Sequence, residues 1–534
     1  MGKVEFHEVI VIGAGFGGIG MLNRMKQDGR DVLCLEAGSD VGGVWFWNTY
    51  PGARTDSEAW YYCFSVSEEL GQEWNWTERY PKQDEVRQYL SYAADKLDVR
   101  SNIVFNSKVD KAIYDADRRQ WSVSVGDKEY ACRFLISAMG ILSSVFIPPF
   151  PGLDVFEGRV LLTARWPDEK PDFTGRRVGL IGTGATGVQI VPEVSQHADS
   201  LTVFQRTANF VIPAQNHDLD DEFRADIKRR YPQIWQKVDR HAFAMPMDVT
   251  GRLYRDFTED QRMEIFEEGW RRGGFRFLFE TFDDVMVDPE CNQAASEFIR
   301  AKIRSIVKDP ETAELLSPRD HPYASKRPPA GHGYYEAYNN PKVTLVDIKT
   351  NKIERVIPEG LQLEDGSIFE FDDLIIATGF DAFTGALTSV EIRGKSGQTI
   401  AEKWAEGAKT LFGVATHDFP NFFMITGPLA TFGNVPTTIE RNIDWIGDAI
   451  KFVRSQSSDA VMEVTEQAEQ GWADLAQEVI DTTVLKDGVG ANSWILGANI
   501  PGKKVAPVAY LGGFHNYVDK LRAEKAPYPS FVLK

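Results

Sequence analysis

Two copies of one glycine-rich turn, each directly after an apolar strand pattern, constrain this 534-residue chain more than any other feature. The pattern G-x-G-x-x-G stands at 13–18 and again at 182–187. In a strand–turn–helix unit, these glycines allow a tight turn and let a pyrophosphate approach the positive N-terminus of the helix. We therefore predict an α/β fold with two Rossmann-like dinucleotide-binding domains.

The residue that closes the second strand of each unit differs in charge. Glu36 follows the strand after the first fingerprint, and a carboxylate there accepts hydrogen bonds from a ribose diol and repels a 2′-phosphate. Arg206 follows the strand after the second fingerprint, and a guanidinium there favours a 2′-phosphate. The sequence therefore predicts one cofactor without this phosphate and one with it, and FAD with NADPH is the simplest pair.

The composition disfavours several classes of partner. A formal charge of −19 and a pI near 5.0 disfavour nucleic acid and anionic membrane surfaces. No apolar run approaches the ~18 residues of a membrane span, and the N-terminus lacks a signal-peptide pattern. The four cysteines have no paired or metal-binding spacing. These features predict a cytoplasmic protein without a metal site, and the missing C-x-x-x-x-C argues against a disulfide reductase.

Strand patterns, a proline-rich break near residue 150 and a helical, Arg- and Phe-rich stretch predict that both domains are discontinuous. The predicted parts are the FAD-binding domain at 1–145 and 376–534, the NADP-binding domain at 150–212 and 323–375, and a helical insertion at 213–322.

Five segments outside the fingerprints resemble the flavin-dependent Baeyer–Villiger monooxygenases, and the resemblance covers nearly the whole chain. The segments are G-G-V-W-F-W-N-T-Y-P-G-A-R-T-D at 42–56, the linker at 156–167, S-K-R-P at 325–328, A-T-G-F-D at 377–381 and N-S-W-I-L-G-A-N-I-P-G-K at 492–503.

The resemblance implies a reaction in which one oxygen atom of O2 enters beside a ketone carbonyl, giving an ester or a lactone. NADPH reduces FAD in these enzymes, and a C4a-peroxyflavin then attacks the ketone. The segment at 427–436 resembles the members that act on cyclic ketones, so we expect a cyclic ketone substrate. The family also implies a monomer.

The resemblance assigns two catalytic residues. Arg327 matches the arginine that stabilises the negative charge of the reacting oxygen, and Asp56 matches the carboxylate that orients this arginine. The lid tryptophan of the family matches Trp494, which would close over NADP and substrate. The expected FAD contacts are Gly13, Gly15, Phe16, Gly18, Glu36, Val44, Trp45, Asp56, Tyr62 and Val109. The expected NADP contacts are Arg54, Thr55, Gly182, Thr183, Gly184, Ala185, Thr186, Gly187, Gln205, Arg206, Lys326, Arg327 and Trp494.

One position departs from the family. The family fingerprint F-x-G-x-x-x-H-x-x-x-W-P has a histidine where this chain has Leu162, although Phe156, Gly158, Trp166 and Pro167 match. Two alternatives therefore stay open. The first is an N- or S-oxidising flavin monooxygenase, and the second is an uncoupled NADPH oxidase or a non-catalytic dinucleotide-binding module.

Overall fold

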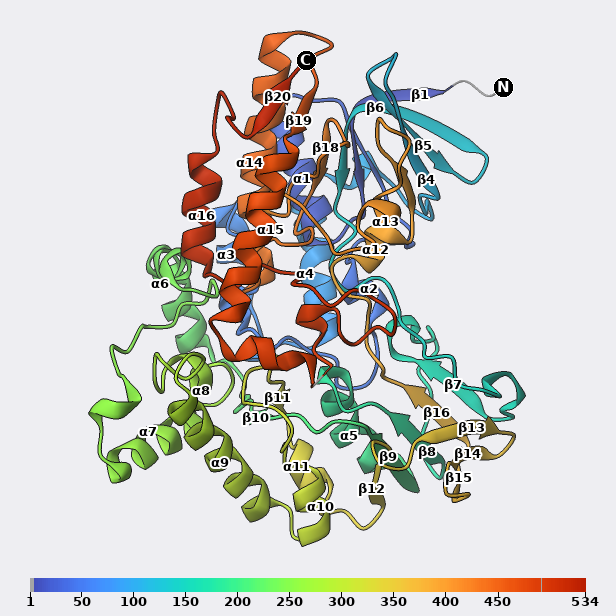
Figure 1. Ribbon diagram of the computed structural model, residues 1–534, viewed down its shortest axis with the longest axis vertical. Coiled ribbons are helices and arrows are strands. Elements are labelled where there is room, and N and C mark those ends of the chain that lie inside the picture. Colours follow the sequence, from blue (N-terminus) through green and yellow to red (C-terminus); the bar gives the residue numbers. More distant parts are fainter. Residues whose placement is uncertain (1–3, 491) are drawn as a thin grey trace.

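Two lobes, each built on a β-sheet, make up the computed structural model, which describes residues 4–490 and 492–534 (Figure 1). The upper lobe in Figure 1 contains the first strands of the chain and strands from its last third. The sheet of the lower lobe comes from the middle of the chain. The chain therefore leaves the upper lobe and later returns to it.

The upper sheet has the strand order β17-β4-β5-β6-β1-β2-β3, and β18 pairs with the second half of β6. Strands β6, β1, β2 and β3 are parallel, whereas β5 is antiparallel to both of its neighbours. The bounds are β1 (Glu5–Ile12), β2 (Val32–Leu35), β3 (Ile103–Val104), β4 (Lys111–Asp115), β5 (Gln120–Val125), β6 (Lys128–Ser137), β17 (Glu391–Arg393) and β18 (Phe422–Met424).

The first fingerprint forms the turn between β1 and α1 (Phe16–Gln27). Gly13 has a φ of +100°, a conformation that glycine adopts without strain. A Cβ atom on Gly18 would lie 1.9 Å from the carbonyl oxygen of Gly13. Both positions therefore require glycine for the turn itself, before any ligand is considered.

The lower sheet is fully parallel, with the order β12-β9-β8-β16-β7. The second fingerprint joins β8 to α5 (Ala185–His197) with the same geometry: Gly182 has a φ of +111°, and a Cβ on Gly187 would lie 2.2 Å from the Gly182 oxygen. The bounds are β7 (Arg159–Leu162), β8 (Arg177–Ile181), β9 (Ser200–Gln205), β12 (Val343–Asp347) and β16 (Asp373–Ile376).

Both fingerprints lie where the strand order reverses. β1 lies between β2 and β6, and β8 lies between β9 and β16, so the chain turns to opposite sides of the sheet at these strands. In open α/β sheets, ligands bind at this switch point, beyond the carboxyl ends of the strands. The topology therefore provides two nucleotide crevices.

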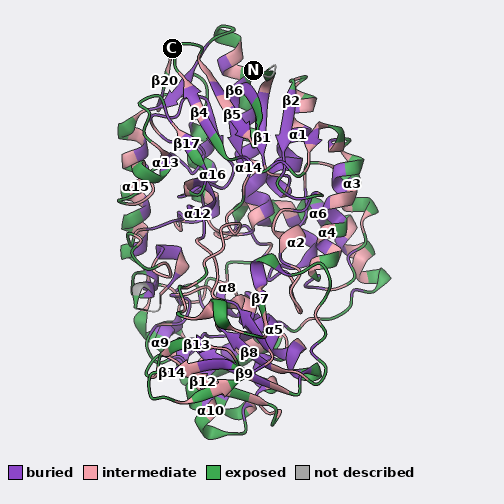
Figure 2. Cartoon of the chain, turned by 90° about the vertical axis from the view of Figure 1, so that its right-hand side faces the viewer, coloured by how far each residue is buried: buried purple, intermediate pink, exposed green. Residues whose placement is uncertain are grey.

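Helices cover both sheets, and Figure 2 shows buried strands beneath helices whose outer faces are exposed. In the upper lobe α1 packs on α14 (Val435–Gln456), where a Cβ on Gly20 would lie 2.7 Å from Ile443 Cδ1. No helix of the described residues is long and apolar enough to span a membrane. The other helices of this lobe are α2 (Val44–Trp47), α3 (Glu68–Glu73), α4 (Gln83–Lys96), α12 (Gly385–Thr388), α13 (Ile400–Lys403), α15 (Glu466–Asp481) and α16 (Phe514–Ala523).

The segment between β10 (Ile212–Pro213) and β11 (Ala330–Gly331) is helical and contacts both lobes. α6 (Asp221–Arg240) packs into the core of the upper lobe through Tyr231 and Ile234. The helices after it pack into the core of the lower lobe through Phe266, Phe277 and Phe298. These helices are α7 (Glu259–Arg272), α8 (Arg276–Phe279), α9 (Pro289–Ile306) and α10 (Pro310–Leu315).

Candidate active site

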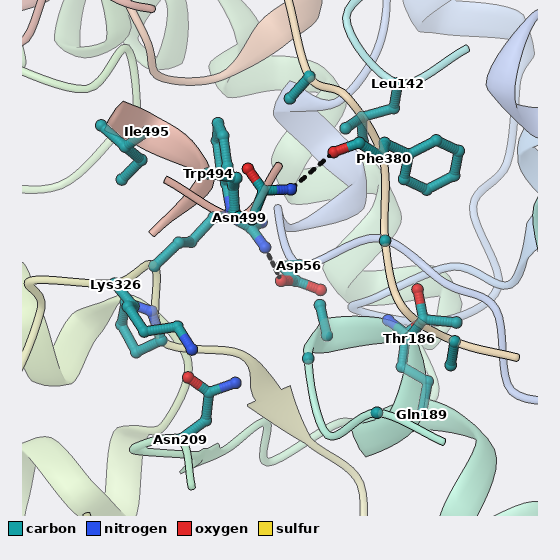
Figure 3. A pocket seen from close by; sticks show the side chains of 18 of the residues that line it. Asp56, Leu142, Thr186, Gln189, Asn209, Lys326, Phe380, Trp494, Ile495 and Asn499 are labelled. Atoms are coloured by element: carbon teal, nitrogen blue, oxygen red, sulfur yellow. Dashed lines mark hydrogen bonds and ion pairs between the residues drawn. The ribbon is translucent and has the colours of Figure 1, made fainter. Parts of the chain in front are cut away.

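A cavity of about 560 Å³ is lined by residues of both lobes, at the ends of β8 and β16 and along the segment that includes α2 (Figure 3). The site residues expected from the sequence that line it are Val44, Trp45, Arg54, Thr55, Asp56, Tyr62, Gly182, Thr183, Gly184, Ala185, Thr186, Arg206, Lys326, Arg327 and Trp494. Eight others lie outside its wall: Gly13, Gly15, Phe16, Gly18, Glu36, Val109, Gly187 and Gln205.

The residues beyond β1 fit a dinucleotide. The Glu36 carboxylate is 4% exposed and accepts hydrogen bonds from the backbone N–H groups of Ala14 (2.5 Å) and Gly38 (2.6 Å). Burial raises the pKa of this carboxyl. Gly15 and Gly43 approach so closely that a Cβ on Gly43 would lie 2.9 Å from Gly15 Cα. Two glycine turns, which let a phosphate approach the backbone, lie beside a buried carboxylate. This arrangement matches the pyrophosphate and ribose of FAD.

Aromatic residues connect this turn to the cavity. Tyr62 accepts a hydrogen bond from the indole N–H of Trp45 at 3.2 Å, and Phe16 packs edge-on against the Tyr62 ring. Burial raises the pKa of Tyr62 to about 12, so its hydroxyl stays protonated. Val109 lies instead in the apolar cluster beneath the ends of β1 and β2.

The turn after β8 leaves space for a second ligand. Among the described residues other than Gly184 and its two chain neighbours, no heavy atom lies within 4 Å of a Cβ built on Gly184, and Thr183 and Thr186 line the cavity. Gln205 does not line the cavity. Its side-chain amide donates instead to the carbonyl oxygen of Leu315 at 2.7 Å.

Two cations lie at the end of this crevice. Arg206 is exposed, and Lys326 lines the same cavity. Burial, and secondly the charge of Arg206, lower the pKa of Lys326 to about 8. The nearby carboxylate of Asp320 is hydrogen-bonded to His321 (2.7 Å) and Lys349 (2.5 Å). Two cations that repel each other fit a phosphate dianion, as the 2′-phosphate of NADPH requires.

Arg327 and Asp56 form an ion pair on the cavity wall. Nη1 of Arg327 lies 2.6 Å from Oδ2 of Asp56, and the Arg327 side chain is 26% exposed (Figure 3 labels Asp56). The guanidinium carbon also lies 5.3 Å from the centre of the Phe275 ring. The arrangement places a permanent cation, fixed on two sides, against a largely apolar space.

The loop that carries Asp56 is tied to α5 through Gln189, which we did not predict from the sequence. The Tyr50 hydroxyl donates to the Gln189 side-chain oxygen (2.9 Å), and the Gln189 amide donates to the Arg54 carbonyl (3.1 Å). A Cβ on Gly52 would lie 2.3 Å from the Gln189 carbonyl oxygen. Gln189 stands two residues after the second fingerprint, and that position is the only sequence signal for it.

Trp494 closes one side of the cavity. Its ring stacks on Phe383 at 6.1 Å and meets Phe432 edge-on at 5.3 Å. Two polar contacts hold the residues that follow Trp494 against the loop after β16. Asn499 donates to the Phe380 carbonyl at 2.9 Å (Figure 3). Lys503 pairs with Asp381.

An apolar part of the cavity wall was also missed from the sequence. Its residues come from the loop after α6, from the segment around α8 and from the last third of the chain, and no short motif connects them. They include Phe243, Met245, Phe275, Leu278, Phe279, Met286, Phe432, Val435 and Leu485.

Leu162, which replaces the family histidine, ends β7 and pairs in register with Ile376. It packs into an apolar cluster with Ile181, Phe204 and Ile376. At this position the side chain therefore contributes apolar packing to the lower lobe.

Known proteins match this chain along its whole length. The family profile described as flavin-binding monooxygenase-like matches residues 6–241. A phenazine N-monooxygenase of Lysobacter antibioticus is 40% identical over 99% of this chain and 97% of its own length. A cyclohexanone 1,2-monooxygenase of an Acinetobacter species is 39% identical, with coverage of 96% and 94%. The crystal structure of OTEMO in complex with FAD and NADP matches with a TM-score of 0.95, at 37% identity and full coverage of both chains.

Fold and site together define a flavin-dependent monooxygenase that uses two dinucleotide cofactors. The chain belongs to the Baeyer–Villiger monooxygenase family. It is an FAD- and NADPH-dependent enzyme of this type, which confirms the resemblance, the two cofactors and the α/β class with two Rossmann-like domains predicted from the sequence.

Proposed function

We propose that the enzyme converts a cyclic ketone into a lactone, with Arg327 and Asp56 as the catalytic pair. The observation that carries the proposal is the 2.6 Å ion pair between these residues on the wall of a cavity lined largely by apolar side chains. We also propose that the domain at 1–145 and 376–534 binds FAD and that the domain at 150–212 and 323–375 binds NADPH.

Bound FAD, once reduced by NADPH, supplies the reactive oxygen from O2. The task of the protein is then electrostatic. Arg327 places N–H donors beside an oxygen that gains negative charge as the ketone carbonyl becomes tetrahedral. The planar fork of guanidinium donors matches an oxyanion and can hold its charge as the reaction proceeds. Asp56 orients the guanidinium, and the segment with Trp494 excludes water that would divert the oxygen into H2O2.

The size and chemistry of the cavity support a compact, apolar substrate. Part of its volume must hold the nicotinamide and the flavin ring, which leaves a small space beside the wall formed by Phe243, Phe279 and Phe432. Small ring ketones fit this description, and two relatives are named for their activity on cyclohexanone and on cyclopentanone.

N-oxidation is the second candidate, because one relative at 40% identity is a phenazine N-monooxygenase. Oxidation of an aromatic nitrogen forms no tetrahedral oxyanion from a carbonyl, so it should not need Arg327. Cyclohexanone and phenazine, assayed side by side with the wild type and Arg327→Ala, separate the two. We expect lactone formation to disappear in the variant while flavin reduction continues; phenazine oxidation that survives the substitution, with no lactone from the wild type, would favour N-oxidation.

An uncoupled NADPH oxidase remains the third candidate, since Leu162 replaces the fingerprint histidine. It predicts that H2O2 accounts for all NADPH consumed, whichever ketone is present.

We further propose that the enzyme is a monomer and that it is located in the cytoplasm.

A further inference from the structure

A buried network of charged side chains lies behind the cavity wall and includes no residue that lines it. Its centre is Glu58, whose side chain is 1% exposed. Arg79 donates to Glu58 at 2.7 Å from the same segment, and Arg276 donates to it at 3.0 Å from α8. Arg276 also pairs with Glu280 at 3.0 Å. The network therefore ties the segment after Asp56 to the helical segment that forms the apolar wall.

α8 cannot fix its own position. It is a single turn of four residues, and helix formation is unfavourable until several turns exist. It follows Gly273 and Gly274, with φ of +71° and +56°, and glycine loses more conformational freedom on folding than any other residue. A Cβ on Gly274 would lie 2.1 Å from the Tyr80 hydroxyl, so glycine is required there. Contacts from outside the helix must hold it, and Arg276 makes the charged ones.

Both ends of the Glu58–Arg276 contact adjoin a neighbour of Arg327. Glu58 stands two residues after Asp56, the ion-pair partner of Arg327. Arg276 directly follows Phe275, whose ring lies 5.3 Å from the Arg327 guanidinium carbon. Asp56 and Phe275 flank the Arg327 guanidinium. The ion pair between Glu58 and Arg276 therefore connects the chain segments that carry these two residues.

We infer that Glu58 and Arg276 are positioning residues that set the place of Arg327 by fixing Asp56 and Phe275 relative to each other. The inference rests on the proposed function, in which Arg327 holds the developing oxyanion. A buried ion pair adds little net stability over apolar packing, yet removing one of its partners is costly. Without Arg276, the buried Glu58 carboxylate keeps Arg79 but loses one of its two arginine partners. The alternative is that this network only stabilises the fold and does not set the position of Arg327. The experiment must distinguish these two roles.

The chain offers a matched control for that alternative. The Asp373 side chain, 0% exposed, also lies between two arginines, Arg159 at 2.5 Å and Arg176 at 2.6 Å. Asp373 begins β16, at the end of the strand opposite to the cavity. Arg176→Met and Arg276→Met therefore each remove one of two arginines from a buried carboxylate, and only the second variant lies behind the site.

The experiment compares the FAD-loaded wild type with both variants in the presence of NADPH and cyclohexanone, and measures lactone, H2O2 and NADPH consumed. We expect Arg276→Met to lower the lactone formed per NADPH by about tenfold, with H2O2 replacing it, because small misplacements of a reacting group are costly. Flavin reduction by NADPH should be unchanged. Arg176→Met should lower the melting temperature comparably and leave the ratio of lactone to NADPH unchanged.

Two further measurements keep the inference testable if Arg276→Met folds poorly. Arg276→Lys keeps the charge and should restore part of the lactone ratio. If Arg276 acts through Phe275, then Phe275→Leu combined with Arg276→Lys should lose less than the sum of the single effects.

Crystal structures of Arg276→Met, or of Arg276→Lys where the first does not crystallise, should show Phe275 and Arg327 displaced. An unmoved Arg327, or a lactone ratio equal to that of the wild type, overturns the inference. If the wild type forms no lactone from any ketone, the proposed function fails, whereas the position of Arg327 in these crystal structures still decides the inference.

Discussion

Replacing Arg327 by lysine keeps one positive charge but removes the planar fork of donors. In the structure, Nη1 of Arg327 is held by Asp56 at 2.6 Å, and the guanidinium carbon lies 5.3 Å from the Phe275 ring. In the proposed mechanism, the remaining N–H groups of the same plane donate to the reacting oxygen. An ammonium that keeps the contact with Asp56 cannot present a second donor in that fixed plane.

The expected loss follows from the number of donors removed. Losing one preorganised donor to an oxyanion costs about 2.7–4 kcal/mol, or about 10²–10³ in kcat. We expect Arg327→Lys to lower lactone formation by this factor, while the rate of flavin reduction by NADPH falls far less. Stopped-flow absorbance measures flavin reduction, and gas chromatography measures lactone.

Two results would refute this reasoning about Arg327. If flavin reduction falls by the same factor as lactone formation, the arginine acts in cofactor binding and not on the oxyanion. If lactone formation is unchanged, no oxyanion contact of this kind exists. Arg176→Lys serves as the control for a general effect of replacing arginine, because Arg176 directly precedes β8 and pairs with Asp373 away from the cavity.

Three further predictions concern the cofactors. Because burial and Arg206 lower the pKa of Lys326 to about 8, its ammonium is charged below that pH and lost above it. The KM for NADPH should therefore rise as the pH increases through about 8 while the KM for NADH stays level; equal rises for both would contradict this. Arg206→Gln should raise the KM for NADPH by about 10–100-fold, since a hydrogen bond to a charged group contributes about 1.5–3 kcal/mol, and an equal change for NADH would show that Arg206 does not contact the 2′-phosphate. Gly18→Ala places a methyl carbon 1.9 Å from the Gly13 oxygen, so the purified variant should lack FAD, and a fully yellow protein would show that the turn can relax.

The fold class could be predicted because it depends on local sequence patterns. Each fingerprint is a continuous segment in which strand, turn and helix follow one another, and the glycines are demanded by contacts inside that segment, as between Gly18 and Gly13. The cofactor preference inferred from Glu36 and from Arg206 likewise depends only on where each residue stands within one strand–turn–helix unit. Such features can be read from sequence because the interacting residues are close along the chain.

The apolar wall and the charged network could not be predicted in this way. Glu58 and Arg276 are 218 positions apart, and each alone looks like an ordinary charged residue. Phe275 and Phe432 reach the same cavity from distant segments. The helical, Arg- and Phe-rich pattern at 213–322 indicated only helices, because periodicity reveals which face is buried and not against what it packs. Gln189 was missed for the same reason, since both of its partners belong to another segment.

The central claim is that the chain transfers one atom of O2 into a ketone. The most direct test supplies the FAD-loaded enzyme with NADPH, cyclohexanone and isotopically labelled O2, and analyses the lactone by mass spectrometry. We predict one lactone for each NADPH consumed, with a single labelled oxygen in the lactone ring. Label found only in H2O2 and water, with the ketone unchanged across cyclic, linear and aryl ketones, would contradict it.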